Sequence, residues 1–187
     1  SEFVFLANIH PALQQEVLCQ VRRPRLTMLD SMNLWIRTMR RELVETMGMV
    51  DMVSINESEA RMLAGTSSVV TAARRILSLS PKVVRIKKGE CGAVVVTEDA
   101  YFVAPAYPLE DVRDPTGAGD SFAGGFLGYL AQYEGEITPA VLRRAVVHGS
   151  AVASFPVEEF GVERLTRLTR VEVERRYREF QRFTLFE

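Results

Sequence analysis

The stretch DPTGAGDSFAGGFLGYL, residues Asp114 to Leu130, joins a glycine-rich turn to a long apolar segment. The apolar segment is typical of a buried helix, and we expect this helix to begin at about Ala118. The small residues in front of it leave several backbone N–H groups unpaired and uncovered at the helix start. Such a start binds anions, because the helix dipole adds to the N–H groups. A capping role would explain Asp114 or Asp120, but not both acids.

The turn lacks the features of two common phosphate-binding motifs. A P-loop needs Lys and then Ser or Thr after its glycines, and none follows here. A dinucleotide fingerprint needs a third glycine three positions after Gly119, where Phe122 stands. The run Gly-Asp-Ser-Phe is also similar to the Gly-Asp-Ser-Leu motif of serine hydrolases, which would make Ser121 a nucleophile. That reading needs a partner histidine, and His148 has no Asp-x-x-His context.

Strand and helix patterns alternate along the chain. Short continuous apolar runs predict strands, and longer segments with helical spacing predict helices. The predicted strands are residues 3–9, 26–30, 50–55, 83–87, 93–97 and 101–103. The predicted helices are residues 11–19, 34–47, 57–63, 69–79, 118–133, 139–155 and 170–183. This alternation predicts an α/β fold with a mainly parallel sheet. Ligands of such sheets bind beyond the carboxyl ends of the strands, where Asp30, Asn56 and Lys88 stand.

Composition limits the class of protein. With 187 residues, the chain is long enough for one domain with a full core. Its formal net charge of −1 gives no field that would attract nucleic acid. No uninterrupted apolar run approaches the ~18 residues of a membrane span, and two cysteines do not suggest a disulfide framework. We therefore expect a cytoplasmic protein with no nucleic-acid partner and no membrane partner.

Residues Asp114 to Phe122 resemble the second signature of the ribokinase-like (PfkB) carbohydrate kinases. In that family the glycine turn, here Gly117, Ala118 and Gly119, is an anion hole for the transferred phosphoryl group. The final Asp of the signature, here Asp120, is the base that accepts the proton of the sugar hydroxyl. Chemistry agrees with these roles, because phosphoryl transfer needs neutralised charge and a positioned acceptor more than covalent help. The resemblance implies ATP-dependent phosphoryl transfer to a hydroxyl of a sugar or nucleoside.

A second segment of the chain, Asn56-Glu57-Ser58-Glu59, is similar to the Asn-x-x-Glu motif of the same family. There the Asn and the Glu organise the water shell of Mg²⁺ near the nucleotide phosphates. Mg²⁺ prefers hard oxygen ligands and keeps several of its waters. The same residues also predict a capping box, in which Asn56 caps a helix and Glu59 reaches back to it. Both readings remain open at this point.

A third segment, Lys87 to Gly92, resembles the family's turn over the ATP phosphates and ribose, whose glycines are three residues apart. The resemblance implies that Lys88, Gly89 and Gly92 contact the nucleotide, and we expect Thr116 and Asn56 to do the same. A plain hairpin turn would explain the third segment equally well.

The resemblance extends from about Phe3 to about Gly161, with its three segments in family order. It implies a mainly parallel, three-layer sheet of the ribokinase-like type that lacks the family's N-terminal strands and lid. Residues 1–187 would then be the C-terminal part of a single kinase domain, carrying the nucleotide side and the base. The expected ligands are ATP, Mg²⁺ and a sugar or nucleoside, and a homo-oligomer remains open. We expect the 187 residues alone to be inactive toward sugars. A non-catalytic nucleotide-binding remnant is the alternative.

Overall fold

The structure is a computed structural model that describes residues 2–185. The chain divides into two compact units. Unit 1 comprises Ser1–Gly89 and Ala93–Val103, and unit 2 comprises Glu90–Gly92 and Ala104–Glu187. The single kinase domain expected over residues 1–187 remains a prediction.

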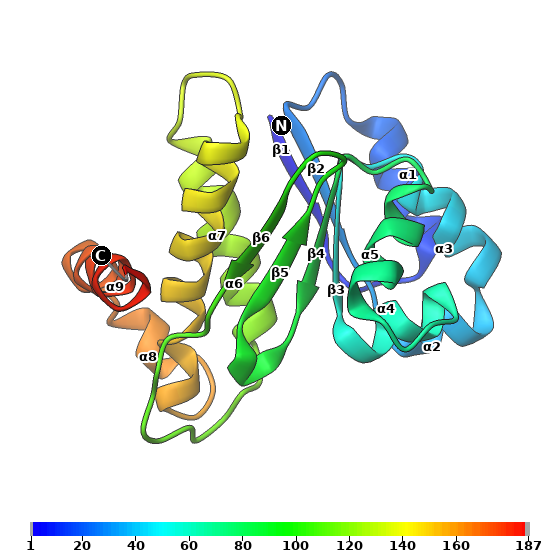
Figure 1. Cartoon of the computed structure of the whole chain (residues 1–187). Coiled ribbons are helices and arrows are strands. Elements are labelled where there is room, and N and C mark those ends of the chain that lie inside the picture. The colour runs from blue at the N-terminus through cyan, green and yellow to red at the C-terminus, as the bar shows by residue number, and fades with distance from the viewer. Residues whose placement is uncertain (1, 186–187) are drawn as a thin grey trace. The chain divides into compact units, whose positions relative to one another are not determined.

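A six-stranded sheet forms the centre of unit 1, and its strands lie side by side in chain order (Figure 1). Neighbouring strands β1 to β4 are parallel, and β5 runs antiparallel to β4. The register places Met28 opposite Met52 and Asn56 opposite Lys87. The strands are β1 Phe3–Leu6, β2 Leu26–Asp30, β3 Met52–Asn56, β4 Val83–Lys87, β5 Ala93–Val96 and β6 Tyr101–Ala104. The prediction of an α/β fold with a mainly parallel sheet is confirmed.

Helices connect the parallel strands of unit 1. They are α1 Pro11–Gln20, α2 Asn33–Thr38, α3 Arg40–Met47, α4 Glu57–Ala64 and α5 Val69–Leu77. Each strand from β2 to β4 is added on the same side of the one before it, and crossovers of this kind are right-handed. The connecting helices therefore gather on one face of the sheet (Figure 1). The core between this face and the helices includes Leu29, Val53, Ile55, Val84, Ile86, Leu43, Met47, Leu63 and Ile76.

The structure corrects the prediction of one helix over residues 34–47. The chain forms two helices, α2 and α3, which meet at Met39 with φ −135° and ψ 38°. The segment contains no Gly or Pro that would announce a break. Contacts with other parts of unit 1 hold the two helices instead. Trp35 of α2 donates a hydrogen bond to the Asn8 side chain at 2.9 Å, and Arg40 of α3 donates one to the Leu63 carbonyl at 2.7 Å.

Unit 2 is mainly helical, with α6 Ala118–Ala131, α7 Pro139–Ala153, α8 Glu163–Thr166 and α9 Arg170–Thr184. Short 3₁₀ turns cover η1 Gly89–Cys91, which crosses the boundary between the units, and η2 Pro156–Glu158. Helices α6 and α7 pack closely because glycines line their contact. A Cβ atom at Gly149 would lie 2.8 Å from the Phe122 ring, and one at Gly125 would lie 2.7 Å from Val152. Among the described residues, no helix is both long and apolar enough to cross a bilayer.

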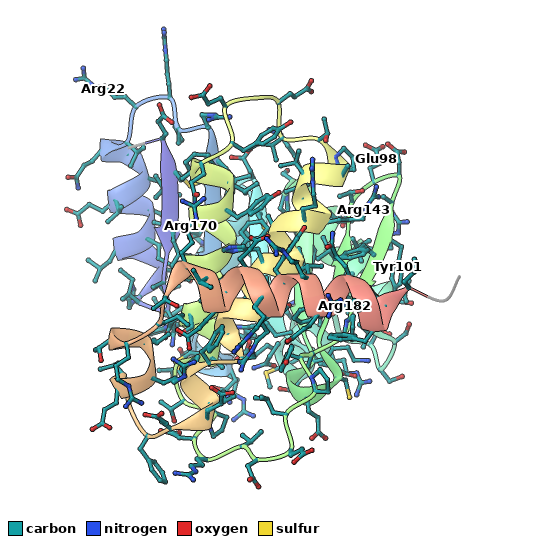
Figure 2. All side chains as sticks on the ribbon, turned by 90° about the vertical axis from the view of Figure 1, so that its left-hand side faces the viewer. Arg22, Glu98, Tyr101, Arg143, Arg170 and Arg182 are labelled. Atoms are coloured by element: carbon teal, nitrogen blue, oxygen red, sulfur yellow. The ribbon has the colours of Figure 1, made fainter. Side chains whose placement is uncertain are left out.

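Helix α9 lies across α7 in Figure 2, where Arg170 and Arg182 mark its two ends. Helical spacing places Val173 and Phe180 on one stripe of the helix, and both side chains are buried. Arg176 is buried as well, and it forms an ion pair of 2.7 Å with a carboxylate of η2. Helix α9 is thus a surface helix that packs through its apolar stripe and a buried arginine.

Candidate functional site

The carboxyl ends of three neighbouring strands in unit 1 carry polar side chains. Asp30, Asn56 and Lys87 are the last residues of β2, β3 and β4. The Nζ atom of Lys87 donates hydrogen bonds to both carboxylate oxygens of Asp30, at 2.9 and 2.6 Å. The two side chains are only 21% and 10% exposed. A largely buried ion pair therefore links β2 to β4 at this edge of the sheet.

Further hydrogen bonds hold Asp30 in place. The backbone N–H of Ser31 donates to Oδ1 of Asp30 at 2.8 Å. The side-chain amide of Gln14, a buried residue of α1, donates to the carbonyls of Asp30 at 3.1 Å and Ala7 at 2.9 Å. These bonds tie the ends of β1 and β2 together. The Asp30 carboxylate is thus fixed by the fold itself.

The capping box predicted at Asn56 and Glu59 is present at the start of α4. Oδ1 of Asn56 accepts hydrogen bonds from the Glu59 N–H and the Ser58 hydroxyl, both at 2.8 Å. Oε2 of Glu59 accepts one from the Asn56 N–H at 3.0 Å. Burial raises the pKa of Glu59, and the Asn56 N–H and the nearby Lys87 only partly offset that effect. Oε1 of Glu59 accepts no hydrogen bond from any described residue.

This edge was also expected to organise Mg²⁺. Carboxylate and amide oxygens are hard ligands, as Mg²⁺ requires, and Oε1 of Glu59 is not engaged in the cap. Within the described part of the chain, no three His, Cys, Asp or Glu side chains converge as a metal-binding group. The donor set therefore fits an ion that keeps most of its waters rather than one held in an all-protein cage. The metal role of Asn56 and Glu59 remains a prediction.

The third segment follows β4. Lys88 is half-buried and forms no ion pair with a described residue. Gly89 has φ +57° and Gly92 has φ +89°, a conformation that favours glycine. A Cβ atom at Gly92 would also lie 2.1 Å from the Ala104 carbonyl oxygen, within unit 2. The backbone therefore requires both glycines, and their contact with a nucleotide remains a prediction.

The glycine turn of unit 2 begins α6. Gly117 is the N-cap residue, with φ +78°, and no side chain caps the helix. The N–H of Ala118 donates to the Pro115 carbonyl at 3.3 Å. The N–H groups of Gly119 and Asp120 have no acceptor among the described residues. The helix start therefore offers two unpaired N–H donors, as an anion-binding site does.

The two acids of this turn have different surroundings. Oδ1 of Asp114 accepts a hydrogen bond from the Thr116 N–H at 3.0 Å. Hydrogen bonds from the side chain and the backbone of Thr116 lower the pKa of Asp114. Asp120 is exposed in the first turn of α6, and it forms no hydrogen bond or ion pair with a described residue. Asp114 thus shapes the turn, whereas the carboxylate of Asp120 is free to meet a ligand.

The serine hydrolase reading finds no support in unit 2. Nδ1 of His148 lies 3.1 Å from the Gly125 carbonyl oxygen, and the imidazole packs against the rings of Tyr129 and Tyr177. Within the described residues no hydrogen bond joins Ser121 to a histidine. Ser121 therefore lacks the base that a nucleophilic serine needs.

The predicted site residues form two groups, one on each unit. Unit 1 brings together Asn56 and Glu59, with Lys88 and Gly89 after the neighbouring strand, and unit 2 carries Gly92 and the turn from Thr116 to Asp120. The pairing of Lys87 with Asp30 was not predicted from the sequence. One signal was available: Lys87 is one of only three lysines, and it ends an apolar strand.

Comparison with known proteins shows the family of the chain. A family model described as pfkB family carbohydrate kinase matches residues 16–167. The chain belongs to this family. The cytidine kinase of Thermococcus kodakarensis is 45% identical over 94 residues, which are 48% of this chain and 34% of that protein. The chain thus matches about a third of the length of this curated relative.

Two solved structures of PfkB-type kinases have the same fold. The nucleoside kinase of Methanocaldococcus jannaschii, an archaeal member of the ribokinase family, superposes with a TM-score of 0.76 at 25% identity, over 96% of this chain and 56% of that one. The ribokinase of Arabidopsis thaliana, solved with ribose and ATP, gives 0.75 at 22% identity, over 95% and 56%. The ribokinase-like fold inferred from the sequence is therefore confirmed.

Proposed function

We propose that the chain carries the nucleotide side and the catalytic base of an ATP-dependent kinase that phosphorylates a hydroxyl of a sugar or nucleoside. The start of α6 supports this function most directly. There an unpaired carboxylate, Asp120, adjoins the unpaired N–H groups of Gly119 and of Asp120 itself. Phosphoryl transfer needs such a pair, because negative charge develops on the phosphoryl oxygens while the acceptor hydroxyl loses its proton.

In this mechanism the acceptor oxygen attacks the γ-phosphorus of ATP, the bond from that phosphorus to the ADP oxygen breaks, and Asp120 takes the hydroxyl proton. The turn of Gly117, Ala118 and Gly119 stabilises the phosphoryl oxygens through its N–H groups. Mg²⁺ would neutralise phosphate charge when bound. Asn56 and Glu59 would hold its water shell, as their oxygens allow.

Lys88, Gly89 and Gly92 would lie against the phosphates and ribose of ATP, and Thr116 would contact the phosphates beside the glycine turn. The Arabidopsis ribokinase of the same fold was solved with ATP, which supports ATP as the phosphoryl donor. The cytidine kinase that is 45% identical to part of the chain supports a nucleoside among the acceptors to be tested.

The experiment that tests this function replaces Asp120 by Asn in the full-length protein. ATP consumption is measured with cytidine, other nucleosides and ribose as acceptors. We expect Asp120→Asn to lower kcat by about two to four orders of magnitude, because a general base is lost. ATP affinity should change little, since the carboxylate meets the acceptor.

Asp111→Asn is the matched control, because Asp111 is another exposed acid of unit 2 that lies outside the turn. It should leave turnover unchanged. Near-normal turnover of Asp120→Asn would refute the assignment of the base. Binding of ATP and Mg²⁺ without turnover of any acceptor would favour the non-catalytic alternative.

A further inference from the structure

The ion pair of Lys87 and Asp30 crosses the end of the strand from which α4 begins. β3 lies between β2 and β4 (Figure 1). The pair therefore spans the strand that ends at Asn56. Asn56 is opposite Lys87 in the register, and Asp30 is opposite Ser54. Because side chains alternate along a strand, all four residues point to the same face of the sheet. The ion pair therefore lies beside the capping box of Asn56 and Glu59.

The charges at this edge nearly cancel. Glu59 interacts with one cation, Lys87, and one carboxylate, Asp30. Arg85, two residues before Lys87 in β4, is a second cation. It is buried and donates a hydrogen bond to the Ser54 hydroxyl at 3.0 Å. Because both oxygens of Asp30 accept from Lys87, its charge is neutralised locally. Glu59 is left as the carboxylate with a free oxygen.

We propose that Lys87 is a positioning residue for the metal–nucleotide complex. This proposal rests on the proposed function. Lys87 holds Asp30 in an ion pair and so keeps that carboxylate away from the divalent cation. The cation's water shell then meets Glu59 and Asn56 alone. The same pairing limits negative charge at the edge, where the polyphosphate of ATP must approach.

If Lys87 has this role, Lys87→Met and Asp30→Asn should change the affinity for a divalent cation in opposite directions. Lys87→Met removes the cation that is hydrogen-bonded to both oxygens of Asp30, so the edge becomes more negative by one charge and a divalent cation should bind more tightly. Asp30→Asn releases the ammonium of Lys87 beside Glu59, so the cation should bind more weakly. Loss of folding stability alone would instead weaken cation binding in both variants.

The test measures Mn²⁺ binding to the full-length protein by electron paramagnetic resonance, with Mn²⁺ in place of Mg²⁺ and no nucleotide present. The expected change is about three- to tenfold tighter binding for Lys87→Met and about the same factor weaker for Asp30→Asn. In a water-like medium, one unit charge at roughly 8 Å changes the affinity for a divalent cation by about this factor. Lys87→Arg keeps the charge and should bind Mn²⁺ as the unaltered protein does.

A matched control lies at the opposite ends of β3 and β4. Lys82 and Asp51 form an ion pair of 2.8 Å, similar in length to that of Lys87 and Asp30, but the Lys82 side chain is 79% exposed. Lys82→Met should leave Mn²⁺ binding unchanged. Should Asp30→Asn fail to fold, the comparison of Lys87→Met with Lys82→Met and Lys87→Arg carries the test.

A second measurement separates this inference from the proposed function. Calorimetric titration with ATP and Mg²⁺ should show weaker binding to Lys87→Met, because the nucleotide complex is negatively charged. The role of Lys87 would be overturned if Mn²⁺ affinity shifted in the same direction in Lys87→Met and Asp30→Asn. It would also be overturned by an unchanged Mn²⁺ affinity or by no Mn²⁺ binding at all. Opposite shifts without any phosphoryl transfer would uphold it and contradict the kinase function instead.

Discussion

Asp114 and Asp120 show how one short turn assigns two carboxylates to different tasks. Asp114 is engaged by Thr116, whereas Asp120 has no partner among the described residues. The sequence could indicate that two acids bracket the glycines, but not which of them was free. That distinction depends on the conformation of Gly117, whose positive φ starts α6 with its first N–H groups exposed.

His148 is a second residue whose surroundings decide its behaviour. The Gly125 carbonyl can only accept a hydrogen bond, so Nδ1 of His148 carries the proton that it donates. Burial lowers the pKa of His148, although the bond to Gly125 acts in the opposite direction. The folded chain therefore keeps this imidazole neutral at a pH where the unfolded chain would protonate it.

This shift predicts a pH dependence of stability. The contribution of neutral His148 is present above the ordinary histidine value of 6.5 and is lost as pH falls through the lower pKa of the folded chain. We expect the free energy of unfolding in urea to fall between pH 7 and pH 5, and His148→Gln to make that fall smaller. An equal fall in the His148 variant would contradict the assignment.

At the scale of elements, strands that end in a charged residue were located well from the sequence. β2 and β4 have the predicted bounds, because in each an apolar run ends at a polar residue on the sheet edge, Asp30 or Lys87. β1 ends at Leu6, three residues earlier than predicted. The apolar pattern continued there, but Asn8 accepts a hydrogen bond from Trp35 instead of extending the strand. Tertiary contacts of this kind leave no local signal.

The capping box of α4 allows its stabilising role to be separated from its metal role. Asn56→Ala removes the cap and should cost about 1 kcal/mol in the free energy of unfolding. Glu59→Gln keeps an acceptor for the Asn56 N–H and removes a charge that burial disfavours. Since the pKa of Glu59 is raised in the folded chain, ionisation reduces stability as pH rises above 4.5. We therefore expect Glu59→Gln to be at least as stable as the unaltered protein at pH 7, and the difference to disappear near pH 4.

The metal role gives the second readout for the same variant. If Glu59 holds the water shell of Mg²⁺, Glu59→Gln should raise the Mg²⁺ concentration needed for half-maximal rate at saturating ATP. An unchanged Mg²⁺ response would leave Glu59 with the cap alone.

For the whole molecule, three short segments in the right order were enough to indicate the family. Their residues are constrained by backbone conformation, as the positive φ angles of Gly89, Gly92 and Gly117 show. The ion pair of Lys87 and Asp30 could not be predicted from the sequence, because its partners are 57 residues apart and meet only through the strand order. Side-chain pairing across a sheet cannot be read from a sequence until the neighbours of each strand are known.

The chain covers 56% of the length of the two structural relatives compared above, and this predicts a division of activities. The residues proposed to contact the nucleotide all lie within the 187 residues. We expect the isolated chain to bind ATP with Mg²⁺ weakly, in calorimetric titration, and to transfer no phosphate to sugars. A phosphorylated sugar produced by the isolated chain would show that the acceptor side has been misplaced.

The chain order of β1 to β4 has a consequence for synthesis. Each parallel strand pairs with the strand made just before it, so the sheet can grow at one edge while the ribosome is still adding residues. Asp30 is made before β4, so its carboxylate cannot pair with Lys87 until that strand has been added.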